Sequence, residues 1–113
     1  MEAAIRAIAE PRRREILRLV WDAELASGEI ASHFEVTRPA ISQHLRVLKE
    51  AGLVAERRVG TRRLYRARPE TMARLRSYLE NFWDEGLARL RRVAEQEERS
   101  IVGKKGERAH AHR

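Results

Sequence analysis

The sequence predicts a mainly α-helical domain with a small β-hairpin, because three patterns follow one another along its 113 residues. Two amphipathic segments, joined by a turn of about three residues, have the spacing of a helix-turn-helix. Two short β-rich segments then flank a turn that contains glycine. A long segment with a 3-4 apolar spacing completes the domain. We therefore expect about five helices and a two-stranded hairpin.

Three short helices are expected in the N-terminal part of the chain. Residues 3–9 place Ile5 and Ile8 on one side of a first helix, and Pro11 suits the first turn of a second helix that ends near Trp21. Because Glu10 is a weaker N-cap than Asp or Ser, this boundary is poorly defined by the sequence. Residues 22–26 are interpreted as a connector. Ser27 is interpreted as the cap of a third helix over residues 28–34.

The segment from Thr37 to Val54 predicts a helix with two chemically distinct faces. Thr37 is a good N-cap, and Gly52 suits the left-handed position that ends a helix. At about 100° per residue, the apolar stripe consists of Ile41, Leu45 and Leu48. The opposite face carries Pro39, Ser42, Gln43 and Arg46. Such side chains match base edges in a DNA major groove, and an ordinary solvated helix is the alternative interpretation.

The expected hairpin has strands over residues 54–59 and 62–67, joined by Gly60-Thr61 with glycine where a type II′ turn requires it. Arginines bracket its tip, at positions Arg57, Arg58, Arg62 and Arg63. Since like charges on facing strands repel, we interpret the cluster as a contact with DNA phosphates. The alternative is a solvated edge hairpin whose charges block aggregation.

A long helix is expected over residues 70–98, with an apolar stripe too wide and too long for a domain of this size to cover. The stripe includes Leu75, Leu79, Phe82, Trp83, Leu87 and Leu90. We expect it to pack partly on its own domain and partly on a second copy of the chain, where Gly86 permits close approach. A purely intramolecular face is the alternative. Residues 1–98 then form the domain, and the basic residues 99–113 form a disordered tail.

Composition restricts the possible functions. The chain has 24 Lys and Arg against 17 Asp and Glu, a net charge of +7 that favours a polyanionic partner. Without cysteine, disulfides, thiolate metal sites and thiol redox sensing are excluded. No nucleophile, base and orienting group stand in a catalytic pattern, so we expect no enzyme and no cofactor. With no signal peptide and no transmembrane segment, a cytoplasmic protein without a membrane partner is expected.

Together these segments resemble the ArsR (arsenic-repressor) family of winged helix-turn-helix transcription factors. The resemblance covers about residues 5–93, and its most specific part is R-P-A-I-S-Q-H-L-R-V-L in the two-faced helix. A-E-P-R-R-R-E-I-L-R-L-V before it and R-R-V-G-T-R-R-L-Y after it add to the resemblance. The chain is most similar to the branch without thiol metal sites, which includes sporulation-delay-type autorepressors. The resemblance implies a homodimer joined through its first and last helices, which would place Ile5 and Ile8 at the interface.

Metal sensing is not expected. Ala26, Gly28 and Ala31 stand where arsenic-sensing members carry cysteines, and the last helix lacks the histidine of zinc-sensing members. His110 and His112 are interpreted as part of the chain end rather than as a metal site. The sequence does not name an effector ligand.

The predicted DNA contacts divide by role. Gln43 suits a bidentate contact to adenine, Arg46 a contact to guanine or phosphate, and Arg38 a phosphate at the helix N-terminus. The full predicted set is Thr37, Arg38, Pro39, Ser42, Gln43, Arg46, Arg57, Arg58, Arg62 and Arg63. The leading hypothesis is a dimeric, sequence-specific repressor that binds double-stranded DNA at an inverted repeat. Repression of its own gene is one form that this hypothesis includes. A dimeric protein-interaction module and a non-specific nucleic-acid binder are the alternatives, and activation instead of repression is left open.

Overall fold

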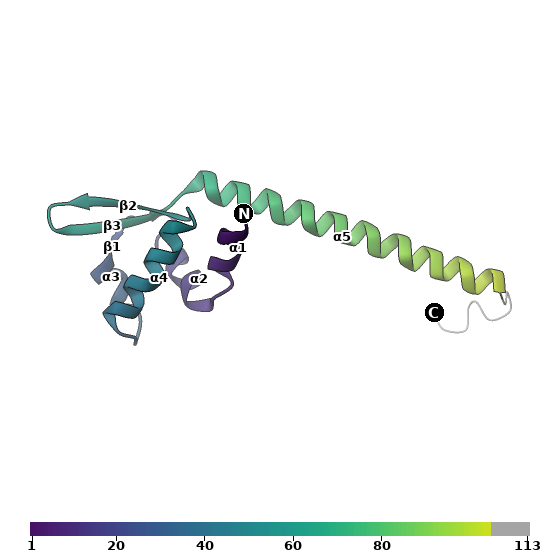
Figure 1. Ribbon diagram of the computed structural model, residues 1–113, viewed down its shortest axis with the longest axis horizontal. Helices are drawn as coiled ribbons and strands as arrows, with labels where there is room; N and C mark the ends of the chain where they lie inside the picture. Colours follow the sequence, from purple (N-terminus) through teal and green to yellow (C-terminus); the bar gives the residue numbers. More distant parts are fainter. Residues whose placement is uncertain (105–113) are drawn as a thin grey trace. The chain divides into compact units, whose positions relative to one another are not determined.

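The computed structural model describes residues 1–104, with side chains for residues 1–100. The chain divides into two units, Met1–Arg76 and the part from Ser77 onward, and each is described by itself. The elements are α1 (Glu2–Ile8), α2 (Pro11–Leu19), β1 (Leu25–Ala26), α3 (Ser27–Ala31), α4 (Arg38–Glu50), β2 (Val54–Val59), β3 (Arg62–Ala67) and α5 (Pro69–Lys104) (Figure 1). The predicted fold class is confirmed, with five helices among the described residues.

The sheet has three antiparallel strands in the order β1-β3-β2, where two were predicted. The hairpin strands have the predicted bounds, with Val54 opposite Ala67 and Val59 opposite Arg62. Gly60 has φ +62° and Thr61 has no positive φ, as a type II′ turn requires. The additional strand, β1, lies within the segment predicted to be a connector. It pairs Leu25 with Tyr65, and so short a strand has no periodicity from which it could be predicted.

The caps of α4 fix where the chain enters and leaves this helix. At its start, the Thr37 hydroxyl accepts a hydrogen bond from the Ala40 N–H at 3.2 Å, as predicted. At its end, Gly52 has φ +79°. The Gly52 N–H donates to the Lys49 carbonyl at 2.9 Å, and the Leu53 N–H donates to the Leu48 carbonyl at 3.0 Å. This pair of bonds is a Schellman motif, which only a left-handed residue completes.

Two other helix starts differ from the sequence interpretation. Glu10, predicted to be a weak cap, caps α2 by accepting the Arg13 N–H at 3.0 Å. Helix α3 begins at Ser27 itself and ends at Ala31, three residues before the predicted Phe34. Its N-cap position is Ala26, whose N–H donates to the Glu29 carboxylate at 2.7 Å. The prediction of a serine cap is therefore wrong, and the side-chain hydrogen bond at this helix start comes instead from Glu29 in the first turn, which accepts the N–H of the N-cap residue.

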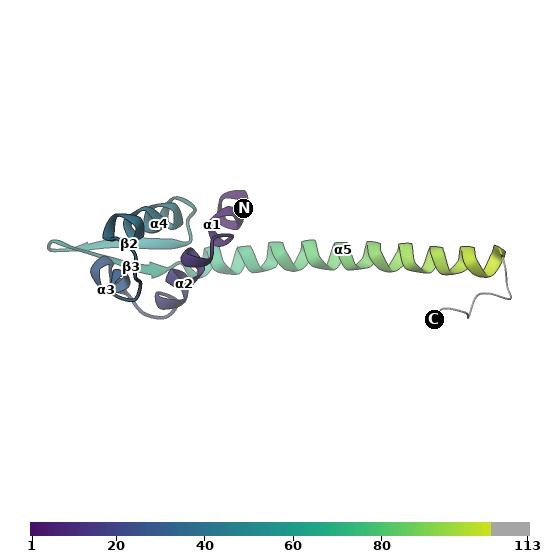
Figure 2. The same ribbon diagram turned by 90° about the horizontal axis from the view of Figure 1, so that it is seen from below.

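The core of the first unit lies between α4, the other short helices and the base of the sheet. From α4 it takes the predicted stripe of Ile41, Leu45 and Leu48, each at most 1% exposed. The other fully buried large side chains are Ile16, Val20, Ile30, Leu53 and Val54. Ile5 and Ile8 are partly buried against this core, and Leu75 at the start of α5 is 4% exposed and belongs to it. Figure 2 shows α4 lying beside the β2–β3 hairpin.

The second unit is the remainder of α5. This helix continues to Lys104, six residues past the predicted end at Glu98. Residues 99–104 include Ser100, Ile101, Val102 and Gly103, which are weaker helix formers than Arg or Lys, so helix propensity does not explain the extension. His110 and His112 lie outside the described residues. The boundary between domain and tail therefore stays a prediction.

Candidate nucleic-acid interface

Helix α4 presents a polar face to solvent while its apolar face is buried. Pro39, Ser42, Gln43 and Arg46 are exposed, and Ile41, Leu45 and Leu48 form part of the core. The two-faced helix predicted from the sequence is therefore confirmed. An exposed face with hydrogen-bonding side chains and one full charge has the chemistry that base edges require.

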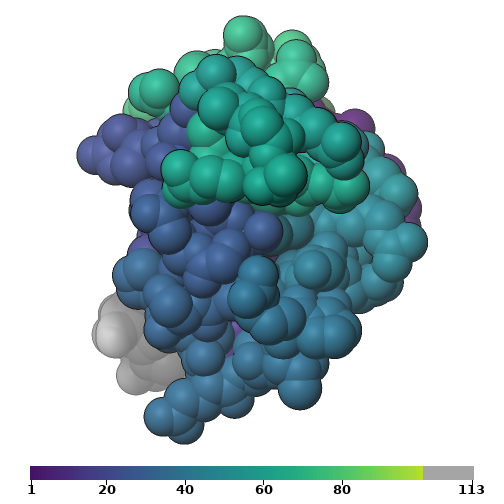
Figure 3. Space-filling view, turned by 90° about the vertical axis from the view of Figure 1, so that its left-hand side faces the viewer, coloured from purple at the N-terminus to yellow at the C-terminus, as the bar shows by residue number. Residues whose placement is uncertain are grey.

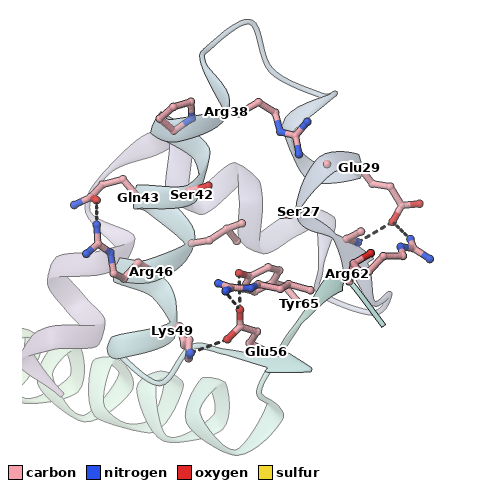
Figure 4. Close-up of a pocket in the computed structure, with 16 residues that line it drawn as sticks. Ser27, Glu29, Arg38, Ser42, Gln43, Arg46, Lys49, Glu56, Arg62 and Tyr65 are labelled. Atoms are coloured by element: carbon pink, nitrogen blue, oxygen red, sulfur yellow. Dashed lines mark hydrogen bonds and ion pairs between the residues drawn. The ribbon is translucent and has the colours of Figure 1, made fainter. Parts of the chain in front are cut away.

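A groove of about 1050 Å³ lies between this face, the N-terminal end of α3 and the hairpin. Figure 3 shows the teal hairpin beside the blue surface of α3 and α4, and Figure 4 shows the side chains that line the groove. The groove brings together seven of the ten predicted DNA-contacting residues, namely Arg38, Pro39, Ser42, Gln43, Arg46, Arg62 and Arg63. The other three, Thr37, Arg57 and Arg58, are exposed but do not line it.

Gln43 and Arg46 act as a pair in the unbound chain. The Arg46 guanidinium donates a hydrogen bond to the Gln43 amide oxygen (Figure 4). The Gln43 amide N–H groups and the remaining guanidinium N–H groups have no partner among the described residues. The pair therefore presents several donors on one turn of the helix, next to the hydroxyl of Ser42.

Three of the four hairpin arginines have carboxylate partners within the chain. Arg57 donates two hydrogen bonds to Glu24, at 2.6 and 2.9 Å. Arg62 pairs with Glu29 at 3.4 Å, and Arg63 with Glu56 at 3.5 Å. Contrary to what the sequence alone indicated, phosphate is therefore not needed to explain why these arginines cluster, because the carboxylates already offset much of the repulsion between them. Sequence patterns gave no sign of them, since Glu24 and Glu29 each lie 33 positions from their partners.

The Glu24 and Arg57 pair lies on the sheet face that turns away from Glu56 and Tyr65. Side chains alternate along β2, so Arg57 and Glu56 point to opposite faces. The hydrogen bond from Arg57 holds the pKa of Glu24 below its ordinary value, and Glu24 in turn raises the pKa of Arg57. This pair stays ionised at neutral pH and ties the chain just before β1 to β2.

Glu56 occupies the end of the groove between α4 and the hairpin. Its Oε1 accepts a hydrogen bond from the Lys49 ammonium at 2.7 Å. Its Oε2 accepts one from the Tyr65 hydroxyl at 3.0 Å and lies 3.5 Å from the Arg63 guanidinium. The hydrogen bond from Lys49 is the largest cause of a lowered pKa at Glu56, and burial raises the pKa of Tyr65. None of Lys49, Glu56 and Tyr65 was predicted as a site residue.

The N-terminal end of α3 closes the other side of the groove. A Cβ atom at Gly28 would lie 3.5 Å from the Arg38 guanidinium, so the Arg38 side chain extends from α4 to the backbone of α3. Ser27, Gly28 and Glu29 line the groove beside it. Ala26, Gly28 and Ala31, the positions compared with metal-binding cysteines, carry no ligating side chain. In the part of the chain that the structure describes, no three His, Asp or Glu side chains gather to hold a metal ion.

No helix among the described residues is both long and apolar enough to cross a membrane.

Comparison with known proteins identifies the family. Residues 10–56 match the family described as "Bacterial regulatory protein, arsR family". The chain is 45% identical over 86 residues to the HTH-type transcriptional regulator Rv2034 of Mycobacterium tuberculosis, covering 76% of this chain and 80% of that protein. It is 40% identical over 60 residues to the transcriptional repressor SdpR of Bacillus subtilis, covering 53% of this chain and 67% of that protein.

Solved structures agree with this result. A crystal structure described as a possible transcriptional regulator for arsenical resistance has a TM-score of 0.70 and 43% identity, covering 84% of this chain and 96% of that one. The solution structure of a homodimeric winged helix-turn-helix DNA-binding domain, Mb0332 from Mycobacterium bovis, has a TM-score of 0.61 and 37% identity, covering 74% and 78%. The protein belongs to the ArsR family of bacterial regulatory proteins, with the winged helix-turn-helix fold.

Proposed function

We propose that the protein is a dimeric, sequence-specific DNA-binding regulator of transcription that represses its target promoter. The observation that carries this proposal is the groove in which the exposed face of α4 and the arginines of the hairpin face the same space. One wall offers groups that suit base edges, and the other offers cations that suit phosphates. The related protein SdpR, named a transcriptional repressor, supports repression.

The residues of the groove divide into two roles. Helix α4 enters the major groove, where Ser42, Gln43 and Arg46 read base edges. Arg38, Lys49, Arg62 and Arg63 bind the flanking phosphates and fix the register of the protein on the duplex. Arg58 extends the phosphate contact beyond the groove at the hairpin tip, and Thr37 and Pro39 set the start of α4.

A second copy of the chain covers the exposed apolar stripe of α5. Phe82, Trp83 and Leu90 are 64–66% exposed, and Leu79 and Leu87 are also exposed. So many large apolar side chains on one helix face indicate a protein interface. The homodimeric state of the Mycobacterium bovis relative supports a second copy as the occupant. Leu75 has little surface left for that interface because it is buried in its own unit, whereas Ile5 and Ile8 are partly exposed.

The dimer is tested by sedimentation of Leu90→Arg beside Ala88→Arg. Both variants add the same charge to the same turn of α5, but position 88 lies opposite the stripe at about 100° per residue. Leu90→Arg should dissociate the dimer at micromolar concentration, and Ala88→Arg should not. Equal dissociation of both variants, or of neither, would contradict the assignment of this face.

The two recognition helices of such a dimer face half-sites about one helical turn apart, so the operator is an inverted repeat. Repression follows when this site overlaps a promoter. The protein acts in the cytoplasm, uses no catalytic chemistry and needs no cofactor to bind DNA. No effector ligand is proposed.

The function is tested by selecting duplexes from a random-sequence pool with the purified protein. Fluorescence anisotropy then compares the selected duplex with a scrambled duplex of equal composition at near-physiological salt. The proposal expects the selected duplex to bind on the order of a thousandfold more tightly. Equal affinity for both would indicate a non-specific nucleic-acid binder. No binding even at low salt would indicate a protein-interaction module.

A further inference from the structure

Glu56 places a largely buried carboxylate inside a groove whose charged side chains are mostly cations. Five cationic side chains line the groove, namely Arg38, Arg46, Lys49, Arg62 and Arg63, together with the carboxylates of Glu29 and Glu56. The Glu56 side chain is only 17% exposed, whereas those of Lys49 and Arg63 are each 53% exposed. The carboxylate thus lies deeper than the two cations that it holds.

The two oxygens of this carboxylate face different elements. Oε1 binds Lys49 on the last turn of α4, and Oε2 binds Tyr65 on β3 (Figure 4). Oε2 also lies 3.5 Å from the Arg63 guanidinium on the same strand. Tyr65 is the direct cross-strand neighbour of Glu56 and is 6% exposed, so its hydroxyl holds the carboxylate from the buried side of the groove. Through one side chain, the spacing between the recognition helix and the hairpin is held by charge-assisted hydrogen bonds.

The same carboxylate competes with DNA. A phosphate that approaches Lys49 or Arg63 must share or displace Glu56, and it meets a fixed negative charge as it does so. A duplex that fits both the helix and the hairpin can engage the outward N–H groups of both cations while Glu56 keeps its own bonds. A duplex that fits poorly engages fewer of these N–H groups, yet it meets the same repulsion.

We propose that Glu56 is a specificity-determining positioning residue that fixes the hairpin against the recognition helix and opposes binding to DNA that does not fit. This inference rests on the DNA-binding function proposed above. It adds two separable effects of one side chain, a charge effect on all DNA and a positioning effect on operator DNA.

Glu56→Gln tests the charge effect. This variant removes the negative charge and keeps the length of the side chain. Affinity for the scrambled duplex should rise about fivefold, the size of one good surface ion pair. The slope of log K against log salt should steepen by about 0.9 for each additional phosphate that the freed cations neutralise. Because affinity for the selected duplex should rise less, the ratio of the two affinities should fall.

Glu24→Gln is the matched control. It removes the same charge from another carboxylate that pairs with a hairpin arginine, but Glu24 lies outside the groove. Its effect on both duplexes should be small and equal. If Glu56→Gln behaves like Glu24→Gln, the charge effect is overturned, because the position of the Glu56 carboxylate inside the groove would then make no difference.

Glu56→Asp tests the positioning effect. The charge is kept, but the shorter side chain cannot reach Lys49 and Tyr65 together. Affinity for the selected duplex should fall about tenfold, as for the loss of one good base contact, while affinity for the scrambled duplex stays unchanged. A wild-type affinity ratio in Glu56→Asp would overturn positioning. A parallel loss on both duplexes would also overturn it, since the affinity ratio would again equal that of the wild type.

The wild-type protein separates this inference from the function on which it rests. If it prefers the selected duplex while the variants do not differ from their controls, only the role of Glu56 fails. If it shows no preference for any duplex, the proposed function fails, and the role of Glu56 fails with it.

Discussion

Arg62→Ala and Arg57→Ala should affect DNA binding differently, although both remove an arginine from the same hairpin. Arg62 lines the groove and its pair with Glu29 is long, at 3.4 Å. Arg57 does not line the groove and is held by two short bonds to Glu24, at 2.6 and 2.9 Å. We therefore propose phosphate contact for Arg62 and sheet support for Arg57.

The magnitude follows from the number of phosphates that the groove neutralises. Each phosphate contributes about 0.9 to the slope of log K against log salt. Five cations line the groove of each protomer, and the two carboxylates Glu29 and Glu56 offset part of their charge. About three neutralised phosphates per protomer give a dimer a slope near −5. Arg62→Ala removes one of them from each protomer and should flatten the slope by about 1.8. Arg57→Ala should leave the slope unchanged and lower the stability slightly.

Anisotropy titrations with a scrambled duplex at several salt concentrations measure these slopes, and urea unfolding measures the stability of each variant. An equal flattening by Arg57→Ala and Arg62→Ala would refute the reasoning, because phosphate contact would then not depend on whether an arginine lines the groove. A steep slope that neither variant changes would remove the hairpin from the interface.

Three further predictions concern the elements that support the interface. Gly52→Ala should destabilise the protein by about 1–2 kcal/mol, because alanine disfavours the left-handed backbone at this position, while the added Cβ meets nothing closer than 3.9 Å. Urea unfolding should show a lower midpoint and an unchanged m-value. An unchanged midpoint would contradict this. Since the pKa of Glu56 is lowered in the fold, its stabilising contribution is present above the ordinary carboxyl pKa of 4.5 and is lost as pH falls through the lower folded pKa. Urea unfolding in acid should therefore show a weaker pH dependence for Glu56→Gln than for the wild type, and identical pH profiles would argue against the pairing. Gly86→Ala has room in the single chain and should stabilise an isolated helix by about 1 kcal/mol. If a second helix packs there, the dimer dissociation constant measured by sedimentation should rise instead.

The sequence predicted those features that depend on neighbours close in the chain. The two-faced pattern of α4, its Thr37 cap and its Gly52 end all depend on residues within a few positions of one another. The same holds for the Gly60 turn and the bounds of the two hairpin strands. Hydrophobic periodicity and capping chemistry are local, so these elements could be predicted from one sequence.

Features that depend on distant partners could not be predicted. Strand β1 exists only because Leu25 finds Tyr65 forty positions later. The carboxylate partners of the hairpin arginines come from the connector, from α3 and from the facing strand. Within the α5 stripe, no periodicity could show that Leu75 is covered by its own unit while Phe82 is exposed. The contacts of Glu56 with α4 and β3 were missed for the same reason, since nothing in the neighbouring sequence distinguishes Glu56 from a solvated glutamate of an edge strand.

The central claim is that the outer face of α4 reads base sequence. It is tested most directly by selecting duplexes from one random pool in parallel with the wild type and with Gln43→Ala, and then sequencing both outputs. The account predicts an inverted repeat for the wild type, and loss of preference at one symmetric pair of base positions for Gln43→Ala. The rest of the repeat should be preserved. An identical repeat from both proteins would contradict the assignment of α4 as the recognition helix.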